Sequence, residues 1–397
     1  MTLDLASVSK QIRQMGEELK ASGEGQQKRI KDALAVFLAN ADDPDTLRGK
    51  VEISRTYWPV ARPVERLDLR RPSSRAEESF RVIATDGSQI EPDRHAPATC
   101  YLINVGSALL QYGASPRAML LSRPQLHFKD DDTHIVSNNR RFLIQGHLLT
   151  VKRSIAEADV LAEVASQHHE GLPTVALQDG TLTLQALEGW GIEDRLREEL
   201  TQEFLSCLER LRQLPVPLAS YISRPRGADV VNMLRVACCP YGIADCQRHC
   251  RELVGARTEP CAWLGDLFDR SLFGLLPLDE GERSALFISS SAISLERYAE
   301  HKVYFFYVNV GKEIARVEVP QWTACDQCLL DLVHRVVYDQ CQRGDGYPRA
   351  LSEAHEKAVV SVGDRQVFWR LVDAAFAGQG LHAAVSQKER SKRLRGV

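Results

Sequence analysis

The sequence predicts a mixed α/β fold. Strand-like apolar runs and amphipathic helical stretches alternate along the chain, as in domains that pack helices on a sheet. The 397 residues are 44 % hydrophobic and 26 % charged, as in an ordinary globular protein. No apolar run reaches the roughly 18 residues of a membrane span. The formal net charge of −3 neither supports nor excludes nucleic acid as a partner.

The N-terminal part is predicted to be helical. Apolar residues recur at steps of three and four over residues 5–40, with a break predicted at the sequence ASGEGQ. We assign residues 1–60 to an N-terminal helical segment and residues 61–397 to a second domain, with a Pro-, Arg- and Ser-rich linker at 60–80. The first residues lack the apolar core of a signal peptide, so we expect a cytoplasmic protein whose ten cysteines are thiols or metal ligands.

The second domain is predicted to alternate strands and helices. β-branched and aromatic runs predict the strands, helical spacing predicts the helices, and Pro348 suits the first turn of the last helix. In order, the prediction is strands at 81–86 and 99–110, an irregular polar stretch at 113–146, a helix at 147–168, a strand at 174–179, a helix at about 193–213, a strand in VPLASYIS, a loop-rich region at 238–282, strands at 285–290, 302–310 and 313–319, and helices at 324–342 and after Pro348.

Two apolar strands end in the same short pattern. Asp86 begins the triplet Asp-Gly-Ser, and Asp179 begins the triplet Asp-Gly-Thr. Asp-Gly is a common turn pair, so either copy alone is adequately explained as an ordinary turn. Because both copies follow a predicted strand, the pattern predicts a carboxylate at the end of each strand.

The helix predicted at 147–168 carries a glutamate on its apolar side. Glu157 lies among Val160 and Leu161 on the helical wheel, whereas Glu163 lies on the polar face. A carboxylate on the apolar side costs free energy unless it is paired or bound to a metal. Arg153, four residues earlier, offers the alternative explanation of a helical ion pair.

The last helix carries a histidine predicted to point inward. His355 lies four residues after Leu351 and three before Ala358, and Tyr347 lies just before the helix begins. Taken alone, a histidine in the position of His355 is more often a hydrogen-bonded core histidine than a ligand.

Four polar side chains are therefore predicted to face an interior: Asp86, Glu157, Asp179 and His355. Three carboxylates and one imidazole suit a hard divalent cation, and the imidazole favours Mn²⁺ over Mg²⁺. Two such ions about 4 Å apart form a phosphodiesterase centre. Ordinary turns, an ion pair and a core histidine remain the alternatives.

Several motifs together resemble the NurA nuclease family. They are DGS, DGTL and YPRALSEAH, with GERSALF, FFYVN and RVEVPQW between the last two, over roughly residues 80–375. The resemblance implies a ribonuclease H-like fold and Mn²⁺-dependent DNA cleavage, as a 5′–3′ exonuclease and/or single-strand endonuclease. It also implies a homodimer that acts with a HerA-type hexameric ATPase in DNA end processing.

The family's site residues carry over by motif. Asp86 matches the first aspartate, Asp179 the second, and Tyr347 and His355 the YP…AH pair. The family's glutamate lies on the helix before the second aspartate, where Glu157 is our choice and Glu163 the fallback. The resemblance implies that His355 is a ligand or proton-transfer group and that Tyr347 positions the scissile phosphate or a water. One departure is the glutamine before Asp179, where an apolar residue is more usual.

A cysteine-rich insertion at about 238–262 lies outside these motifs. Its members are Cys238, Cys239, Cys246, Cys250 and Cys261. Two interpretations stay open, namely scattered buried thiols or a structural zinc or iron–sulfur site. The chain also lacks a G-x-x-x-x-G-K-[ST] motif, so a motor must come from a partner.

Two other classes of function compete with a nuclease. One is a non-catalytic adaptor that threads DNA through the ATPase complex. The other is a metal-dependent phosphohydrolase that acts on small nucleotides.

Overall fold

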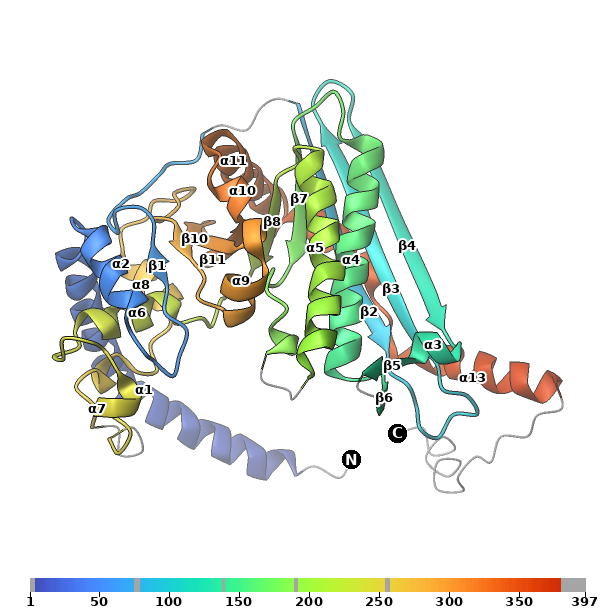
Figure 1. Ribbon diagram of the computed structural model, residues 1–397, viewed down its shortest axis with the longest axis horizontal. Coiled ribbons are helices and arrows are strands. Elements are labelled where there is room, and N and C mark those ends of the chain that lie inside the picture. Colours follow the sequence, from blue (N-terminus) through green and yellow to red (C-terminus); the bar gives the residue numbers. More distant parts are fainter. Residues whose placement is uncertain (1–3, 75–78, 138–139, 189–191, 254–257, 380–397) are drawn as a thin grey trace. The chain divides into compact units, whose positions relative to one another are not determined.

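The computed structural model describes residues 4–74, 79–137, 140–188, 192–253 and 258–379. The chain divides into two compact units, each with its own helices and strands (Figure 1). The first unit comprises residues 1–73, 223–290 and 304–317, and the second comprises residues 74–222, 291–303 and 318–397. The predicted boundary at residue 60 stays a prediction. Within the described ranges, no helix is both long and apolar enough to cross a bilayer.

The first unit packs helices against a short run of strands in the order β1-β9-β10-β11. Its core contains the rings of Phe37, Phe273, Phe287, Phe305 and Tyr307. The elements are α1 (Leu5–Ala39), α2 (Pro44–Glu52), β1 (Arg62–Pro63), α6 (Asp229–Ala237), α7 (Cys246–His249), α8 (Asp269–Leu275), β9 (Phe287–Ile288), β10 (Val303–Asn309) and β11 (Ile314–Pro320).

The break predicted within residues 5–40 is absent, since α1 is one continuous helix. Asp4 caps its N-terminus by accepting from the backbone N–H groups of Ala6 and Ser7. Glycine in a helix costs only about 1 kcal/mol, and ASGEGQ contains no proline to block the turn. Ala33 and Phe37, near the other end, are fully buried and fix the helix on the core.

The second unit contains a sheet in the order β8-β7-β2-β3-β4. Strands β2, β3 and β4 form an antiparallel meander, while β7 runs parallel to β2 and to β8. The elements are β2 (Phe80–Ile90), β3 (Tyr101–Tyr112), β4 (Arg117–His127), α3 (Asp130–Thr133), β5 (His134–Ser137), β6 (Arg140–Leu143), α4 (His147–His168), β7 (Thr174–Asp179), α5 (Asp194–Gln213), β8 (Leu218–Ile222), α9 (Ala292–Arg297), α10 (Gln321–Ala324), α11 (Gln327–Arg343), α12 (Arg349–Ala358) and α13 (Val362–Gly378). The predicted mixed α/β class is confirmed.

Strands β2 and β4 are among those that differ from the prediction. The stretch at 113–146 contains the long strand β4, which the sequence hides because most of its side chains are exposed and lack an alternating apolar pattern. Strand β2 does not end at Asp86, because Asp86, Gly87 and Ser88 continue the ladder opposite β3 as far as Ile90. The Asp-Gly-Ser triplet is therefore extended strand and not a turn.

Two helices reach the same segment of β2 from opposite faces. Side chains alternate along a strand, so Thr85 and Gly87 face α4, whereas Asp86 and Ser88 face α12. Helix α4 lies side by side with α5 (Figure 1). The two faces of β2 thus carry different parts of the candidate site.

Candidate active site

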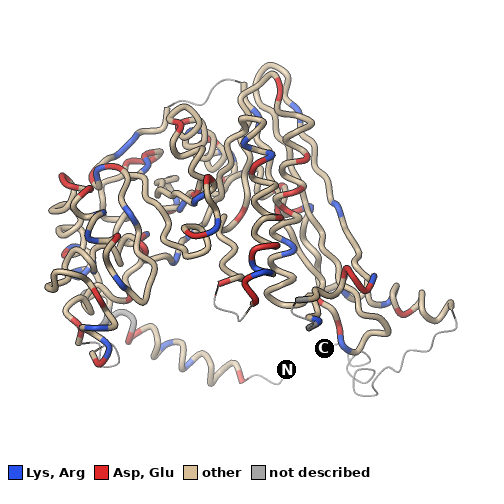
Figure 2. The backbone as a smooth tube through the Cα atoms, in the orientation of Figure 1, with Lys and Arg blue, Asp and Glu red and all other residues tan. Residues whose placement is uncertain are grey.

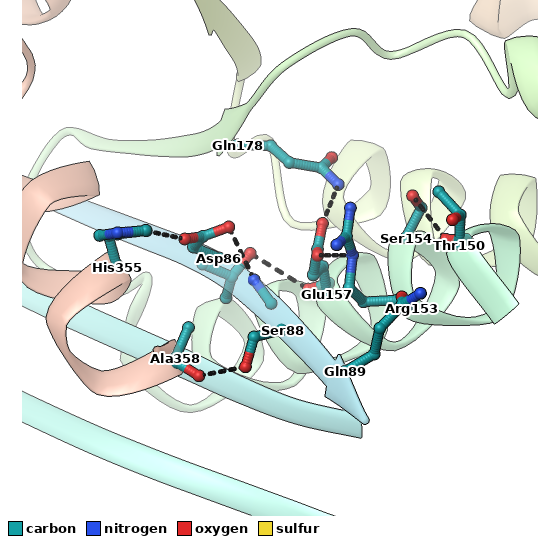
Figure 3. A network of polar contacts seen from close by, with 12 residues as sticks. Asp86, Ser88, Gln89, Thr150, Arg153, Ser154, Glu157, Gln178, His355 and Ala358 are labelled. Carbon is teal, nitrogen blue, oxygen red and sulfur yellow. Dashed lines mark hydrogen bonds and ion pairs between the residues drawn. The ribbon is translucent and has the colours of Figure 1, made fainter. Parts of the chain in front are cut away.

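Asp86 on β2 contacts His355 on helix α12. His355 Nδ1 lies 2.6 Å from Asp86 Oδ2 (Figure 3). The prediction that His355 points inward is wrong, because its side chain is 63 % exposed. Helix α12 instead buries Ala354 and Ala358 against the sheet, and the next position along the helix directs His355 to the rim beside Asp86.

Helix α12 approaches the sheet closely enough to require a glycine. A Cβ on Gly106, which pairs with Asp86 in the ladder, would lie 2.1 Å from the carbonyl oxygen of Ala354 and 2.4 Å from the amide nitrogen of Ala358. Ser88 Oγ and Asn104 Nδ2 both donate to the carbonyl oxygen of Ala358. These contacts fix the end of α12 and hence the position of His355.

Glu157 on α4 is buried, as predicted, with 5 % of its surface exposed. Gln178 Nε2 donates to its Oε2 at 3.4 Å, and Arg153 Nε lies 3.1 Å from its Oε1 (Figure 3). A Cβ at Gly87 would lie 2.3 Å from Oε1, so this glycine leaves room for the carboxylate against β2. Burial raises the pKa of Glu157 to about 7; Arg153 opposes this shift and Asp86 adds to it.

Asp179 stands at the C-terminal end of β7, and the predicted strand end is confirmed there. Tyr347 Oη donates to Asp179 Oδ1 at 2.7 Å. Desolvation by the surrounding chain and the charge of Asp86 both raise the pKa of Asp179. Burial, and then the charge of Asp179, raise the pKa of Tyr347, so its hydroxyl stays protonated at neutral pH.

The structure arranges these side chains in three sets of contacts: Asp86–His355, Gln178–Glu157–Arg153 and Asp179–Tyr347. Asp86 lies on the face of β2 that meets α12, and Glu157 packs against the opposite face at Gly87. Among the described residues, no three His, Cys, Asp or Glu side chains form a group that could hold a metal ion. Their assignment as catalytic residues therefore stays a prediction.

The donor set nevertheless fits a hard divalent cation. The like charges of Asp86 and Asp179 both contribute to the raised pKa of Glu157. Such mutual repulsion is what a cation relieves, and oxygen ligands suit Mg²⁺ and Mn²⁺. Glu157 Oε1 and Gln178 Oε1 are buried without a hydrogen bond, so polar atoms are available where Glu157 meets β2. Glu163, the fallback, instead accepts from Arg123 at 2.7 Å.

The raised pKa of Glu157 predicts a pH-dependent cost in stability. The free carboxyl has a pKa of 4.5 and the folded one a pKa of about 7, so folding becomes less favourable as pH rises between these values. Without metal, Glu157→Gln is expected to raise the melting temperature by several degrees at pH 8 and to change it little at pH 5. Scanning calorimetry at both pH values measures this. A lower melting temperature at pH 8 would show that Arg153 compensates the buried charge fully.

Three contributors escaped the sequence reasoning, namely Gln178, Gly87 and Gly106. A polar residue in the otherwise apolar strand before Asp179 was a usable signal for Gln178. The two glycines lie within extended strands, and their role depends on Glu157 and α12, which pack against them from distant parts of the sequence.

The cysteines of the insertion gather in the first unit. The pocket that they share is lined by Cys239, Cys246, Cys250 and Cys261, together with Trp58 and Arg235. Burial raises the pKa of Cys246 to about 11, so it is a neutral thiol near pH 7. All ten cysteines are free. The described residues give no support to a zinc or iron–sulfur site here.

Comparison with known proteins gives one family over most of the chain. The family model described as the NurA domain matches residues 80–360. A solved structure described as NurA bound to dAMP and manganese is 16 % identical, covers 86 % of this chain and 94 % of its own, and has a TM-score of 0.33. A prototype foamy virus protease–reverse transcriptase is 15 % identical, with coverage of 43 % and 19 % and a TM-score of 0.20. LC9-RNase H1 is 13 % identical, with coverage of 39 % and 69 % and a TM-score of 0.18. No curated protein matches the chain.

Proposed function

Because this chain belongs to the NurA family of nucleases, we propose that it is a metal-dependent deoxyribonuclease. The family match spans all five predicted site residues: Asp86, Glu157, Asp179, Tyr347 and His355. Its ribonuclease H-like core, predicted from the sequence, agrees with the antiparallel meander and the two parallel strands beside it. The observation that supports the proposal most is the placement of three carboxylates within one unit, on β2, on α4 and at the end of β7.

In this proposal Asp86, Glu157, Asp179 and His355 hold Mn²⁺, with Mg²⁺ as the alternative ion. The manganese in the solved NurA structure supports that choice. When bound, two ions would supply an activated water and stabilisation of the leaving oxygen. Three carboxylates also exclude a bound phosphodiester unless their charge is neutralised, so substrate binding depends on the cations.

Tyr347 is proposed to act on the substrate directly, and for His355 proton transfer is the alternative to holding the ion. The hydroxyl of Tyr347 is protonated and already donates to Asp179, so it can orient a water or a phosphate oxygen beside that carboxylate. His355 is exposed at the rim and bonded to Asp86 through Nδ1, which leaves Nε2 for proton transfer with solvent.

We also propose that the protein acts as a homodimer with a HerA-type hexameric ATPase, in the cytoplasm. The family supports this partnership, and the sequence lacks a P-loop motif with which to drive DNA itself. The reaction proposed for the complex is 5′–3′ exonucleolytic and/or single-strand endonucleolytic cleavage during DNA end processing.

Metal removal tests the chemistry. Dialysis against EDTA is expected to abolish cleavage of end-labelled DNA, because the carboxylates then repel the phosphodiester, and Mn²⁺ is expected to restore it better than Mg²⁺. Gel analysis of labelled single- and double-stranded oligonucleotides, with and without the ATPase, measures the rate and the polarity.

Two results would contradict this proposal in different ways. Full activity after verified removal of metal would exclude a metal-dependent mechanism. DNA binding without cleavage under any ion, with or without the ATPase, would favour the non-catalytic adaptor.

A further inference from the structure

Arg153 is the cation nearest to the buried carboxylate of the candidate site. Its Nε lies 3.1 Å from Glu157 Oε1, and the contact is an ion pair and not an aligned hydrogen bond. Figure 3 shows the guanidinium beside the carboxylate. Within the part of the chain that the structure describes, Arg153 makes no second ion pair.

Arg153 is partly exposed to solvent, although the carboxylate that it contacts is buried. Its side chain is 31 % exposed, whereas that of Glu157 is 7 % exposed. The Nε of Arg153 is therefore buried against Glu157, while part of the same side chain is open to solvent. Arginine stays charged at all relevant pH values and presents a planar set of donors that matches a phosphate.

We propose that Arg153 is a phosphate-binding residue that alternates between Glu157 and the DNA backbone. This inference rests on the proposed function. Without a divalent cation, Arg153 neutralises Glu157. With the cation at Glu157, the two positive charges repel each other beside Oε1, and the guanidinium turns to a backbone phosphate at the site.

Gln178 can hold the carboxylate of Glu157 in place while Arg153 moves from Glu157 to a phosphate. Its Nε2 donates to Glu157 Oε2, whereas the Nε of Arg153 lies beside Oε1. Glu157 therefore keeps its place when the guanidinium leaves. The unpaired Oε1 of Gln178 is buried in the same place, so the amide also offers an acceptor to the moving group.

The chain offers a matched control pair. Arg123 on β4 contacts Glu163 on α4 at 2.7 Å, and the exposures of 29 % and 39 % make it a comparable arginine–glutamate pair outside the site. Arg123→Gln removes a charge of the same type, so it reports the general effect of one fewer arginine on folding and on DNA affinity.

The first measurement is Mn²⁺ binding without DNA, followed by electron paramagnetic resonance. Arg153→Gln is expected to bind Mn²⁺ as tightly as the wild type or up to about tenfold more tightly, because a competing cation is removed. Arg123→Gln is expected to match the wild type. A weaker Mn²⁺ affinity in Arg153→Gln would overturn the proposal, since it would mean that the arginine only holds Glu157 in place.

The second measurement is binding of a labelled single-stranded oligonucleotide with Ca²⁺ in place of Mn²⁺, by fluorescence anisotropy over a range of salt concentrations. Loss of one phosphate contact is expected to weaken binding roughly tenfold at low salt and to reduce the salt slope by about 0.7. The cleavage rate in Mn²⁺ is expected to fall roughly a hundredfold, with partial recovery in Arg153→Lys. An unchanged salt slope, equal to that of Arg123→Gln, would overturn the proposal.

The two binding measurements separate this inference from the proposed function. If the wild type binds Mn²⁺ and DNA but cleaves nothing, the nuclease assignment fails, and the Arg153 variants still report on the phosphate contact. If the wild type cleaves DNA and Arg153→Gln does so at an unchanged rate, the nuclease assignment stands and the role of Arg153 is excluded.

Discussion

Glu157→Gln is expected to lower the rate of DNA cleavage at least about a thousandfold, equivalent to roughly 4 kcal/mol of transition-state stabilisation. The amide keeps the shape of the side chain and its place beside Gln178, but it loses the negative charge that holds a cation. Because the neutral form of Glu157 is favoured by burial, the fold is expected to survive the change. A gel assay with end-labelled DNA at saturating Mn²⁺ measures the rate, and circular dichroism checks the fold.

Glu163→Gln is the matched control for this prediction. Glu163 lies on the same helix, α4, and accepts from Arg123 away from Gln178. Its loss removes a partly exposed ion pair, so cleavage is expected to stay within about twofold of the wild type. The opposite pattern, with Glu163 essential and Glu157 dispensable, would show that the catalytic glutamate had been misassigned.

Gly106→Ala is expected to damage both the fold and the activity. The new Cβ would meet backbone atoms of Ala354 and Ala358, which cannot rotate away as a side chain can. Helix α12 must move off the sheet, at a cost of about 3 kcal/mol in folding free energy, and His355 moves away from Asp86. We expect a lower melting temperature together with loss of cleavage, measured by calorimetry and the gel assay.

Gly49→Ala supplies the comparison for Gly106. Gly49 lies within α2, where an added Cβ would meet nothing within 4 Å. Alanine favours a helix over glycine by about 1 kcal/mol, so this change is expected to be neutral or stabilising. Equal loss of stability from both substitutions would mean that the close packing of α12 on β3 is not the reason why residue 106 must be glycine.

Side-chain periodicity correctly predicted the helices and strands that have one buried face and one exposed face or a fully buried run. The bounds of α4 agree with the predicted helix at 147–168, and the burial of Glu157 follows from its place on that wheel. Strand β7 and the position of Asp179 at its end were predicted for the same reason. A buried face is imprinted on the local sequence, so local sequence is sufficient to find it.

The failures concern residues whose neighbours come from elsewhere in the chain. Asp-Gly usually signals a turn, but at Asp86 the pairing with β3 keeps the backbone extended. His355 was placed inward because it follows Leu351 by one helical turn, yet the sheet meets Ala354 and Ala358 instead. Gly106 has no local signal at all, since its role is set by where α12 packs.

The candidate site that contains Asp86 and His355 can be completed only late in the synthesis of the chain. The two residues are 269 positions apart, and at roughly 5–20 residues per second the ribosome needs tens of seconds to make the second after the first. Until then β2 and β3 can pair, but the groove over Gly106 has no α12 to fill it. On the proposed site assignment, a chain that ends before Tyr347 lacks both Tyr347 and His355, and we expect it to be unable to cleave DNA.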